Sequence, residues 1–301
     1  MLSYVRGDLF QAPAQTLVNT VNTVGVMGKG IAKTFKEVFP EMFKEYQALC
    51  ERHELRIGTL HLYRTPHKNV LNFPTKEHWR NPSRPQYIEA GLRTFVEFYE
   101  RMGIRSVAFP PLGCGNGELD FEGTVRPLME RYLSKLPIQV FVYAPLARRD
   151  APEHRQPEAI RRWLRSMPRE LPFEEVWEDL RERYATKREV RTLTGRNTFE
   201  AVYVPEDDVI RIWASKTFLV TPEELQTYWT QLRDFGLLTA SMLPESRRRE
   251  ASQMLPILGE LPYVRRVVVG DAYESLQYTP TVGLQIAPAD APAPQRQLSL
   301  V

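Results

Sequence analysis

Cysteine is scarce in this sequence, because only Cys50 and Cys114 occur among its 301 residues. Two cysteines exclude a framework of disulfide bonds and a cysteine-rich zinc site. The sequence also lacks a run of about 18 apolar residues, so it predicts no membrane-spanning helix. The start, MLSYVRGDLF, has no charged region followed by an apolar stretch, which a secretory signal peptide requires. We therefore expect a cytoplasmic protein without membrane association.

A large excess of one charge is absent as well. Residues 1–150 contain 20 basic and 15 acidic side chains, whereas residues 151–301 contain 20 and 22. The mild basic surplus suits a phosphate-bearing partner, but it is far from the dense patch of a dedicated DNA-binding protein, and ordinary surface charge explains it equally well. His53, His61 and His67 show no metal-ligand spacing, so we expect neither a metal nor a cofactor.

Strand-like and helix-like segments alternate in the first half of the chain. Strands are predicted at 2–10, 16–22, 58–64, 68–74, 106–113 and 139–145, and helices at 30–53, 86–103 and 121–136. Strands separated by helices of this length imply crossover connections and a sheet that is covered on both faces. The sequence therefore predicts an α/β fold, with a three-layer α/β/α domain and a central mixed sheet at residues 1–148.

Prolines and clustered charges break this alternation at residues 149–170, which we interpret as a linker containing a short basic helix. A smaller α+β domain is predicted at residues 171–285, and a flexible tail at 286–301. The predicted elements of this domain are a helix at 173–190, a hairpin of 198–204 with 209–215, a helix that Thr221 and Glu224 begin as a capping box, a helix near 248–261 and a strand at 264–270.

Glycine is sparse too, yet three of the 16 glycines lie in NTVNTVGVMGKGIA, residues 19–32. Gly28 and Gly30 precede a predicted helix, whose N-terminal amides favour a diphosphate. A second glycine-rich turn, PPLGCGNG at 110–117, follows a predicted buried strand. Either turn alone is explained as a simple link between strand and helix, and neither matches a P-loop or a dinucleotide fingerprint. Two such loops at the carboxyl ends of strands can clamp a pyrophosphate from both sides.

The stretches GDL, VNTVN with GVMGKGIA, and PPLGCGNG follow one another in the order seen in macrodomains, and residues 1 to about 145 resemble this ADP-ribose-binding family. The resemblance implies that Asp8 holds the adenine and that Asn22 approaches the distal ribose. The implied ADP-ribose-binding residues are Asp8, Leu9, Asn22, Met27, Gly28, Gly30, Ile31, Leu112, Gly113, Cys114, Gly115, Asn116 and Gly117. From the residues alone, Cys114 is most simply a small buried residue of its turn.

The stretch NFPTKEHWRNPSRPQYIE is similar to the terminal ADP-ribose glycohydrolase subclass, in which a lysine after this strand carries catalysis. Lys76 is the match. Within the subclass the sequence most resembles the DarG family, antitoxins that remove ADP-ribose from thymidine in single-stranded DNA after a DarT toxin has placed it there. Their C-terminal part binds the toxin. The resemblance therefore implies a hydrolase with ADP-ribosylated single-stranded DNA as substrate and a DarT-like ADP-ribosyltransferase toxin as partner. A non-catalytic ADP-ribose reader and a hydrolase of ADP-ribosylated protein are the alternatives.

A lysine is a nucleophile only after it loses its proton, so its usual pKa of about 10.4 must fall through desolvation or a nearby cation. Taken alone, Lys76 is most simply a surface lysine. Human-type members of the subclass pair the lysine with an aspartate, and the matching position here is Gly117. Asp120 could substitute for that aspartate, although a carboxylate at a helix N-terminus explains it more simply.

Cations and aromatic rings alternate beside Lys76, at His78, Trp79, Arg80 and Arg84. This mixture suits single-stranded DNA, because bases stack on rings while guanidinium groups meet phosphates. Packing of Trp79 into the core is an equally weighted alternative. In the second domain, the acidic turn at 206–208 fits a surface that competes with DNA for a basic partner, and solvated loop charge is its alternative.

Overall fold

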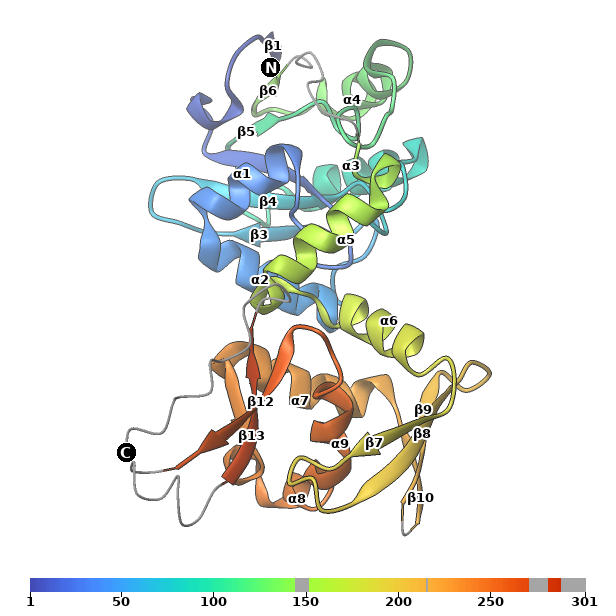
Figure 1. Ribbon diagram of the computed structural model, residues 1–301. Helices are drawn as coiled ribbons and strands as arrows, with labels where there is room; N and C mark the ends of the chain where they lie inside the picture. The colour runs from blue at the N-terminus through green and yellow to red at the C-terminus, as the bar shows by residue number, and fades with distance from the viewer. Residues whose placement is uncertain (144–151, 215, 271–280, 288–301) are drawn as a thin grey trace. The chain divides into compact units, whose positions relative to one another are not determined.

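The computed structural model describes residues 1–143, 152–214, 216–270 and 281–287. Parts of the predicted linker (149–151) and tail (288–301) therefore lie outside the described residues. The chain divides into two compact units, Met1–Ile160 and Arg161–Val301, and each is considered by itself (Figure 1).

A six-stranded mixed sheet forms the centre of the described part of the first unit, in the order β1-β6-β5-β2-β4-β3. The strands are β1 (Leu2–Val5), β2 (Thr16–Val21), β3 (His61–Tyr63), β4 (Asn69–Pro74), β5 (Ser106–Phe109) and β6 (Gln139–Tyr143). Every neighbouring pair is parallel except β3 with β4, so the carboxyl ends of the parallel strands meet at one edge of the sheet. The predicted mixed sheet is confirmed.

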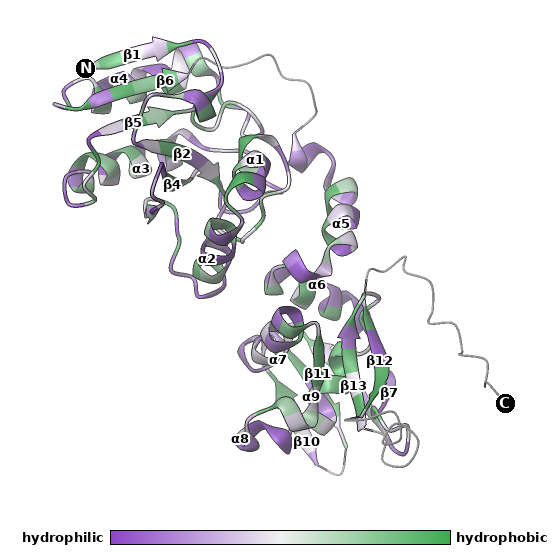
Figure 2. Cartoon of the chain, turned by 90° about the vertical axis from the view of Figure 1, so that its left-hand side faces the viewer, coloured by the Kyte–Doolittle hydropathy of each residue, from purple (hydrophilic) through white to green (hydrophobic). Residues whose placement is uncertain are grey.

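Helices cover both faces of this sheet. They are α1 (Gly30–Val38), α2 (Pro40–Glu51), α3 (Pro85–Phe98) and α4 (Arg126–Leu133); the short turn η1 (Leu9–Gln11) lies between β1 and β2, and η2 (Phe121–Val125) directly precedes α4. Along β2, Leu17 and Val21 pack into the core with α1 and α2, whereas Val18 packs into the core with α3 and α4, as the alternation of side chains along a strand requires. In Figure 2, α1, α2 and α3 carry both apolar and polar residues, as expected for helices with one face on a sheet. The predicted three layers are confirmed.

The helix predicted at 30–53 is two helices, which is a correction. Phe39 separates them with a non-helical backbone (φ −127°, ψ 68°), and Pro40 occupies the first position of α2. The pyrrolidine ring lacks an N–H and restricts the preceding residue, so Pro40 begins a helix and does not continue one.

Helix α5 (Pro157–Ser166) follows the turn η3 (Glu153–Arg155) and crosses the boundary between the two units. The helices and turns of the second unit that follow are η4 (Pro168–Glu170), α6 (Phe173–Arg183), α7 (Pro222–Phe235), η5 (Ala240–Met242), α8 (Glu245–Arg248) and α9 (Ala251–Leu258). Its strands are β7 (Arg188–Arg191), β8 (Thr198–Val204), β9 (Val209–Trp213), β10 (Thr217–Val220), β11 (Leu237–Thr239), β12 (Val264–Val269) and β13 (Thr281–Ile286).

The strands of the second unit form two antiparallel sheets among the described residues, in the orders β10-β9-β8-β7 and β11-β13-β12. The hairpin of β8 with β9 is confirmed, with Val204 paired to Val209 across the turn. The capping box is present as well, because the backbone N–H of Glu224 donates to the hydroxyl of Thr221 and the backbone N–H of Thr221 donates to the carboxylate of Glu224. The helix predicted at 173–190 is too long, since α6 ends at Arg183 and β7 begins at Arg188.

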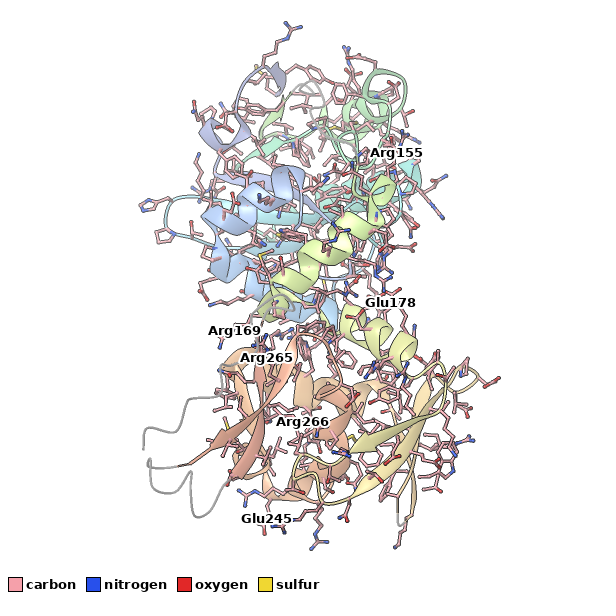
Figure 3. All side chains as sticks on the ribbon, viewed as in Figure 1. Arg155, Arg169, Glu178, Glu245, Arg265 and Arg266 are labelled. Atoms are coloured by element: carbon pink, nitrogen blue, oxygen red, sulfur yellow. The ribbon has the colours of Figure 1, made fainter. Side chains whose placement is uncertain are left out.

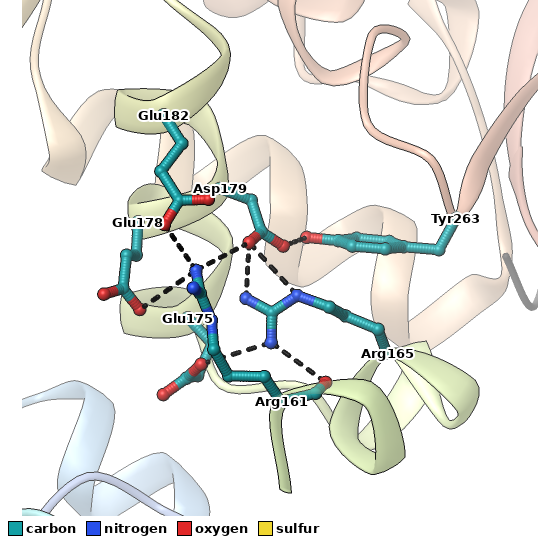
Figure 4. Close-up of polar contacts among 7 residues, drawn as sticks. All are labelled: Arg161, Arg165, Glu175, Glu178, Asp179, Glu182 and Tyr263. Carbon is teal, nitrogen blue, oxygen red and sulfur yellow. Dashed lines mark hydrogen bonds and ion pairs between the residues drawn. The ribbon is translucent and has the colours of Figure 1, made fainter. Parts of the chain in front are cut away.

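Buried ion pairs join α6 to the end of α5 within the second unit (Figure 4). The guanidinium of Arg165 contacts the carboxylates of Asp179 and Glu175, and the hydroxyl of Tyr263 donates to Asp179 at 2.9 Å. Arg161 pairs with Glu182 at 2.6 Å on the outer side of the same cluster. Burial, followed by the negative charge of Asp179, holds the pKa of Tyr263 well above its usual value, so its hydroxyl remains a donor.

Candidate functional site

Two glycine-rich loops face each other at the carboxyl edge of the first sheet. Residues 22–29 connect β2 to α1, and residues 110–118 follow β5. Gly30 has a φ of +59°, and a Cβ atom there would lie 2.9 Å from the side-chain nitrogen of Asn116. This left-handed backbone favours glycine, because other side chains rarely adopt it. The structure thus brings together the two loops that the sequence suggested as a clamp.

Asn22 organises the first loop from within. Its side-chain oxygen accepts from the backbone N–H groups of Val24 and Val26 at 3.1 and 3.2 Å, and its nitrogen donates to the Val26 carbonyl at 2.6 Å. The hydroxyl of Tyr46 donates to the same oxygen at 3.0 Å. The buried amide is therefore engaged by the loop and by Tyr46 in this structure.

Lys76 reaches from the sheet to the second loop. Thr75 extends the pairing beyond the end of β4, with its N–H donating to the carbonyl of Val21 at 2.9 Å. The next side chain, Lys76, is 5% exposed and donates from Nζ to the carbonyl oxygen of Asn116 at 2.8 Å. The lysine that the resemblance selects is thus a buried amine between the loops, and not a surface cation.

Position 117 has no room for a side chain. The N–H of Ser83 donates to the carbonyl of Gly117 at 3.0 Å, and a Cβ at 117 would lie 2.1 Å from the Ser83 hydroxyl and 2.3 Å from the Gly113 carbonyl. An aspartate therefore cannot be accommodated there. Asp120 is exposed and accepts from the N–H of Gly123 at 2.5 Å, which caps η2. This contact supports the capping interpretation of Asp120.

The remaining members of the predicted ADP-ribose set lie around these loops. Asp8 is exposed and accepts from the N–H of Phe10 at 3.0 Å. Burial, with the charge of Asp8 as a second cause, raises the pKa of Tyr143 at the end of β6. Leu9, Met27 and Leu112 are buried in the cores beneath the loops, so they support the loops from the protein side.

Cys114 lies in the second loop and is half-buried. Burial raises the pKa of its thiol to about 12, and the charge of Asp120 contributes. The thiol therefore stays protonated at neutral pH and is not a nucleophile. This agrees with its interpretation as a small residue of the turn.

Trp79 is fully buried, which corrects its prediction as a DNA contact and favours core packing. Arg80 is half-buried and its guanidinium lies 4.7 Å from the Trp79 ring, and His78 packs on the same ring. Arg84 is exposed, and its guanidinium lies 5.5 Å from the ring of Tyr87. Among the four predicted DNA contacts, Arg84 thus has the most accessible side chain.

Sequence reasoning missed a carboxylate in the stretch assigned to the linker. Glu153 is 6% exposed, and its side chain accepts a hydrogen bond from the backbone N–H of Lys29 in the first loop. Burial raises its pKa to about 7, although the nearby charges of Lys76 and Lys29 oppose this rise. The local sequence around Glu153 contains no pattern that would have placed it against the loops.

In the part of the chain that the structure describes, no group of three or more histidine, cysteine, aspartate or glutamate side chains is arranged to hold a metal ion. Over the same ranges, no helix has both the length and the apolar character needed to span a membrane.

The N-terminal half of the chain is similar in sequence to known proteins. The Macro domain family matches residues 18–128. A curated DNA ADP-ribosyl glycohydrolase of Thermus aquaticus is 45% identical over 150 residues, which cover 48% of this chain and 42% of that protein. A DNA ADP-ribosyl transferase-DNA ADP-ribosyl glycohydrolase fusion protein of Thermosipho africanus is 44% identical over 167 residues, covering 49% of this chain and 43% of the fusion. The solved macrodomain of Thermus aquaticus DarG is 47% identical, with a TM-score of 0.46, and the match covers 48% of this chain and 99% of that one.

The mixed sheet between helix layers and the paired loops at its carboxyl edge define the class as a macrodomain. The N-terminal half of this chain belongs to the macrodomain family, whose model matches residues 18–128, and it is 45% identical there to a curated DNA ADP-ribosyl glycohydrolase. The chain spans about two fifths of the length of the curated relatives it matches.

Proposed function

We propose that this protein is a DNA ADP-ribosyl glycohydrolase, which releases ADP-ribose from thymidine in single-stranded DNA with Lys76 as the nucleophile. The observation that carries the proposal is the amine of Lys76, buried between the two glycine-rich loops and held by the Asn116 carbonyl. The names of the Thermus and Thermosipho relatives support the DNA substrate.

Each part of the site has a task in this reaction. The N-terminal amides of α1 bind the phosphates, because a helix N-terminus favours anions. The neutral amine of Lys76 attacks C1″ of the distal ribose, and the bond to the thymine nitrogen breaks with its electron pair. The thymine nitrogen takes the proton that the lysine nitrogen loses when the new bond forms, and water hydrolyses the lysine–sugar adduct to free ADP-ribose and the lysine.

The first experiment distinguishes an enzyme that removes ADP-ribose from a reader that only binds it. Purified wild type, Lys76→Ala and the matched control Lys44→Ala are incubated with single-stranded DNA that carries ADP-ribosylated thymidine. Lys44 is a suitable control because its side chain is 70% exposed on α2. We expect release by wild type and Lys44→Ala and loss of release in Lys76→Ala, with ADP-ribose binding retained in all three. Binding by all three proteins without release would make the protein a reader.

We also propose that the second unit binds a DarT-like toxin, so that the chain acts as an antitoxin in two ways. The fusion of transferase and glycohydrolase in the Thermosipho relative supports a functional link with such a toxin. Within the acidic turn, Glu206 and Asp207 are exposed, whereas Asp208 is engaged by Arg181 and Trp177. The accessible acidic pair is therefore Glu206 and Asp207.

The full chain with Lys76→Ala tests this second role, because it removes the proposed catalysis and leaves the second unit unchanged. We expect it to inhibit DNA ADP-ribosylation by a DarT-like toxin at stoichiometric concentration, and Glu206→Lys with Asp207→Lys to weaken that inhibition. A toxin that modifies DNA equally fast with and without the Lys76→Ala chain would contradict direct binding.

A further inference from the structure

Residues 153–156 lie across both glycine-rich loops of the first unit. At one end, Lys29 of the first loop donates from Nζ to the side-chain oxygen of Gln156 at 3.2 Å. At the other end, Glu118 of the second loop contacts His154 and Arg155, each at 2.6 Å. Arg155 lies at the N-terminal end of α5 (Figure 3). The segment is thus fixed to each of the two loops that are proposed to hold ADP-ribose.

Beside these attachments, the side chain of Glu153 is buried. It accepts the backbone N–H of Lys29, which is the residue that precedes the first turn of α1. The charges of Lys76 and Lys29 act on it, and its own charge is one of the smaller causes, after burial, that raise the pKa of Tyr46. Tyr46 in turn donates to Asn22, the residue proposed for the distal ribose.

A carboxylate and a phosphate offer the same chemistry to this site, namely negative charge and oxygen lone pairs. The N–H at the start of α1 cannot donate fully to both at once. We infer that residues 153–156 form a strap that closes the candidate ADP-ribose pocket, with the Glu153 carboxylate in the place of a ligand anion, and that ADP-ribose binds only after the strap opens. This inference rests on the proposed function, because it assumes that the pocket is an ADP-ribose site.

The contacts of the strap suit a closure that can be reversed. The side chain of Arg155 is 64% exposed, and ion pairs of exposed side chains contribute little. Burial disfavours the charged form of Glu153 and therefore raises the pKa of its carboxylate. A group that would be better solvated outside the pocket leaves it easily when a ligand competes for the same N–H.

The test is calorimetric titration of ADP-ribose into the full chain at pH 8, for wild type, Glu153→Ala, Arg155→Ala and Glu158→Ala. Glu158 is an exposed glutamate of α5 outside the strap, so it is the matched control. If the strap is closed about nine-tenths of the time, Glu153→Ala lowers the Kd about tenfold, since the apparent Kd scales with the inverse of the open fraction. Arg155→Ala lowers it to a smaller extent, and Glu158→Ala leaves it unchanged.

The Arg155→Ala variant also distinguishes release of the strap from a simple loss of positive charge near the pocket. Loss of a cation near the pocket weakens the binding of an anionic ligand, whereas release of the strap strengthens it. Binding by Glu153→Ala and Arg155→Ala that is no tighter than wild type would overturn the strap and leave ADP-ribose binding intact. Unchanged affinity with lost DNA turnover in Glu153→Ala would likewise overturn it and make Glu153 a catalytic group. No binding by wild type or any variant would refute the proposed function itself.

Discussion

Gly117 shows at the scale of one residue how the second loop is built. Its carbonyl accepts from Ser83, and any Cβ would collide with Ser83 and Gly113. Gly115 two positions earlier faces open space. Replacing each glycine by alanine therefore tests the steric contact at position 117. The variant at position 115 controls for the general effect of replacing a glycine in this loop.

We predict that Gly117→Ala lowers the free energy of unfolding by about 1–3 kcal/mol, the usual cost of overpacking. Gly115→Ala changes the free energy of unfolding by less than about 0.5 kcal/mol, because surface substitutions rarely exceed that value. Urea unfolding of both variants checks this. Equal stability of the two variants would contradict the close contact with Ser83.

Glu153 couples the stability of the first unit to pH. Its pKa rises from 4.5 in the unfolded chain to about 7 in the folded one, with burial as the main cause. The stabilisation from the bound proton is thus complete below pH 4.5, and it is lost as the pH rises to 7 and above. The titratable groups whose charges interact with the carboxylate are Lys29, Lys76 and Tyr46, from the first loop, the end of β4 and α2.

We predict that Glu153→Gln stabilises the chain relative to wild type at pH 8 but much less at pH 5. Since one pKa unit corresponds to about 1.4 kcal/mol, the expected difference between the two pH values is on the order of 2–3 kcal/mol. Urea unfolding at both pH values, with Glu158→Gln as control, measures it. A pH-independent difference between Glu153→Gln and wild type would show that the carboxylate is not buried in solution.

The sequence was informative about some site residues and silent about others. The glycines could be selected because their spacing along the chain carries a pattern, and Lys76 could be selected from the resemblance to the glycohydrolase subclass. The burial of Trp79 and of Glu153 could not, because each depends on contacts that form only when distant segments pack together. For Glu153 the partner is the first loop, far away in the sequence.

At the scale of elements, the ion pairs of α5 with α6 are the clearest polar contribution to the second unit (Figure 4). The side chain of Asp179 is 10% exposed and accepts from both Arg165 and Tyr263. The side chain of Glu182 on the same helix is 60% exposed. The two acids therefore differ in burial and share the neighbouring cation Arg161.

We predict that Asp179→Ala lowers the free energy of unfolding by about 3–5 kcal/mol, because it leaves the buried guanidinium of Arg165 without its main partner. Glu182→Ala lowers it by less than about 1 kcal/mol, as for exposed ion pairs. Thermal and urea unfolding measure both. A loss below 1 kcal/mol for Asp179→Ala would mean that the cluster contributes little to stability.

Elements with strong local signals could be predicted, and those that depend on distant pairing could not. The β8–β9 hairpin and the start of α7 were recognised from alternation and from the capping box. Strand β11 has three residues and pairs with β13, so nothing in its own sequence marks it. The end of α6 at Arg183 was missed because the charged residues that follow it also suit a helix.

At the scale of the whole molecule, the function proposed for the first unit has more support than the function proposed for the second. The first unit matches a known family, and it has paired loops and a buried lysine at one edge of its sheet. The second unit has two antiparallel sheets and a buried ion-pair cluster among its described residues, and its toxin-binding role is a proposal. The central claim about function therefore lies with Lys76 and its substrate.

The most direct test is the single-turnover rate of ADP-ribose release by wild type and Lys76→Ala, from ADP-ribosylated single-stranded DNA and from ADP-ribosylated protein in parallel. We predict release from the DNA substrate by wild type, at least about 100-fold faster than by Lys76→Ala and than from protein, since loss of a nucleophile removes the chemical step. Release from DNA at equal rates by wild type and Lys76→Ala, or release from protein alone, would contradict the account.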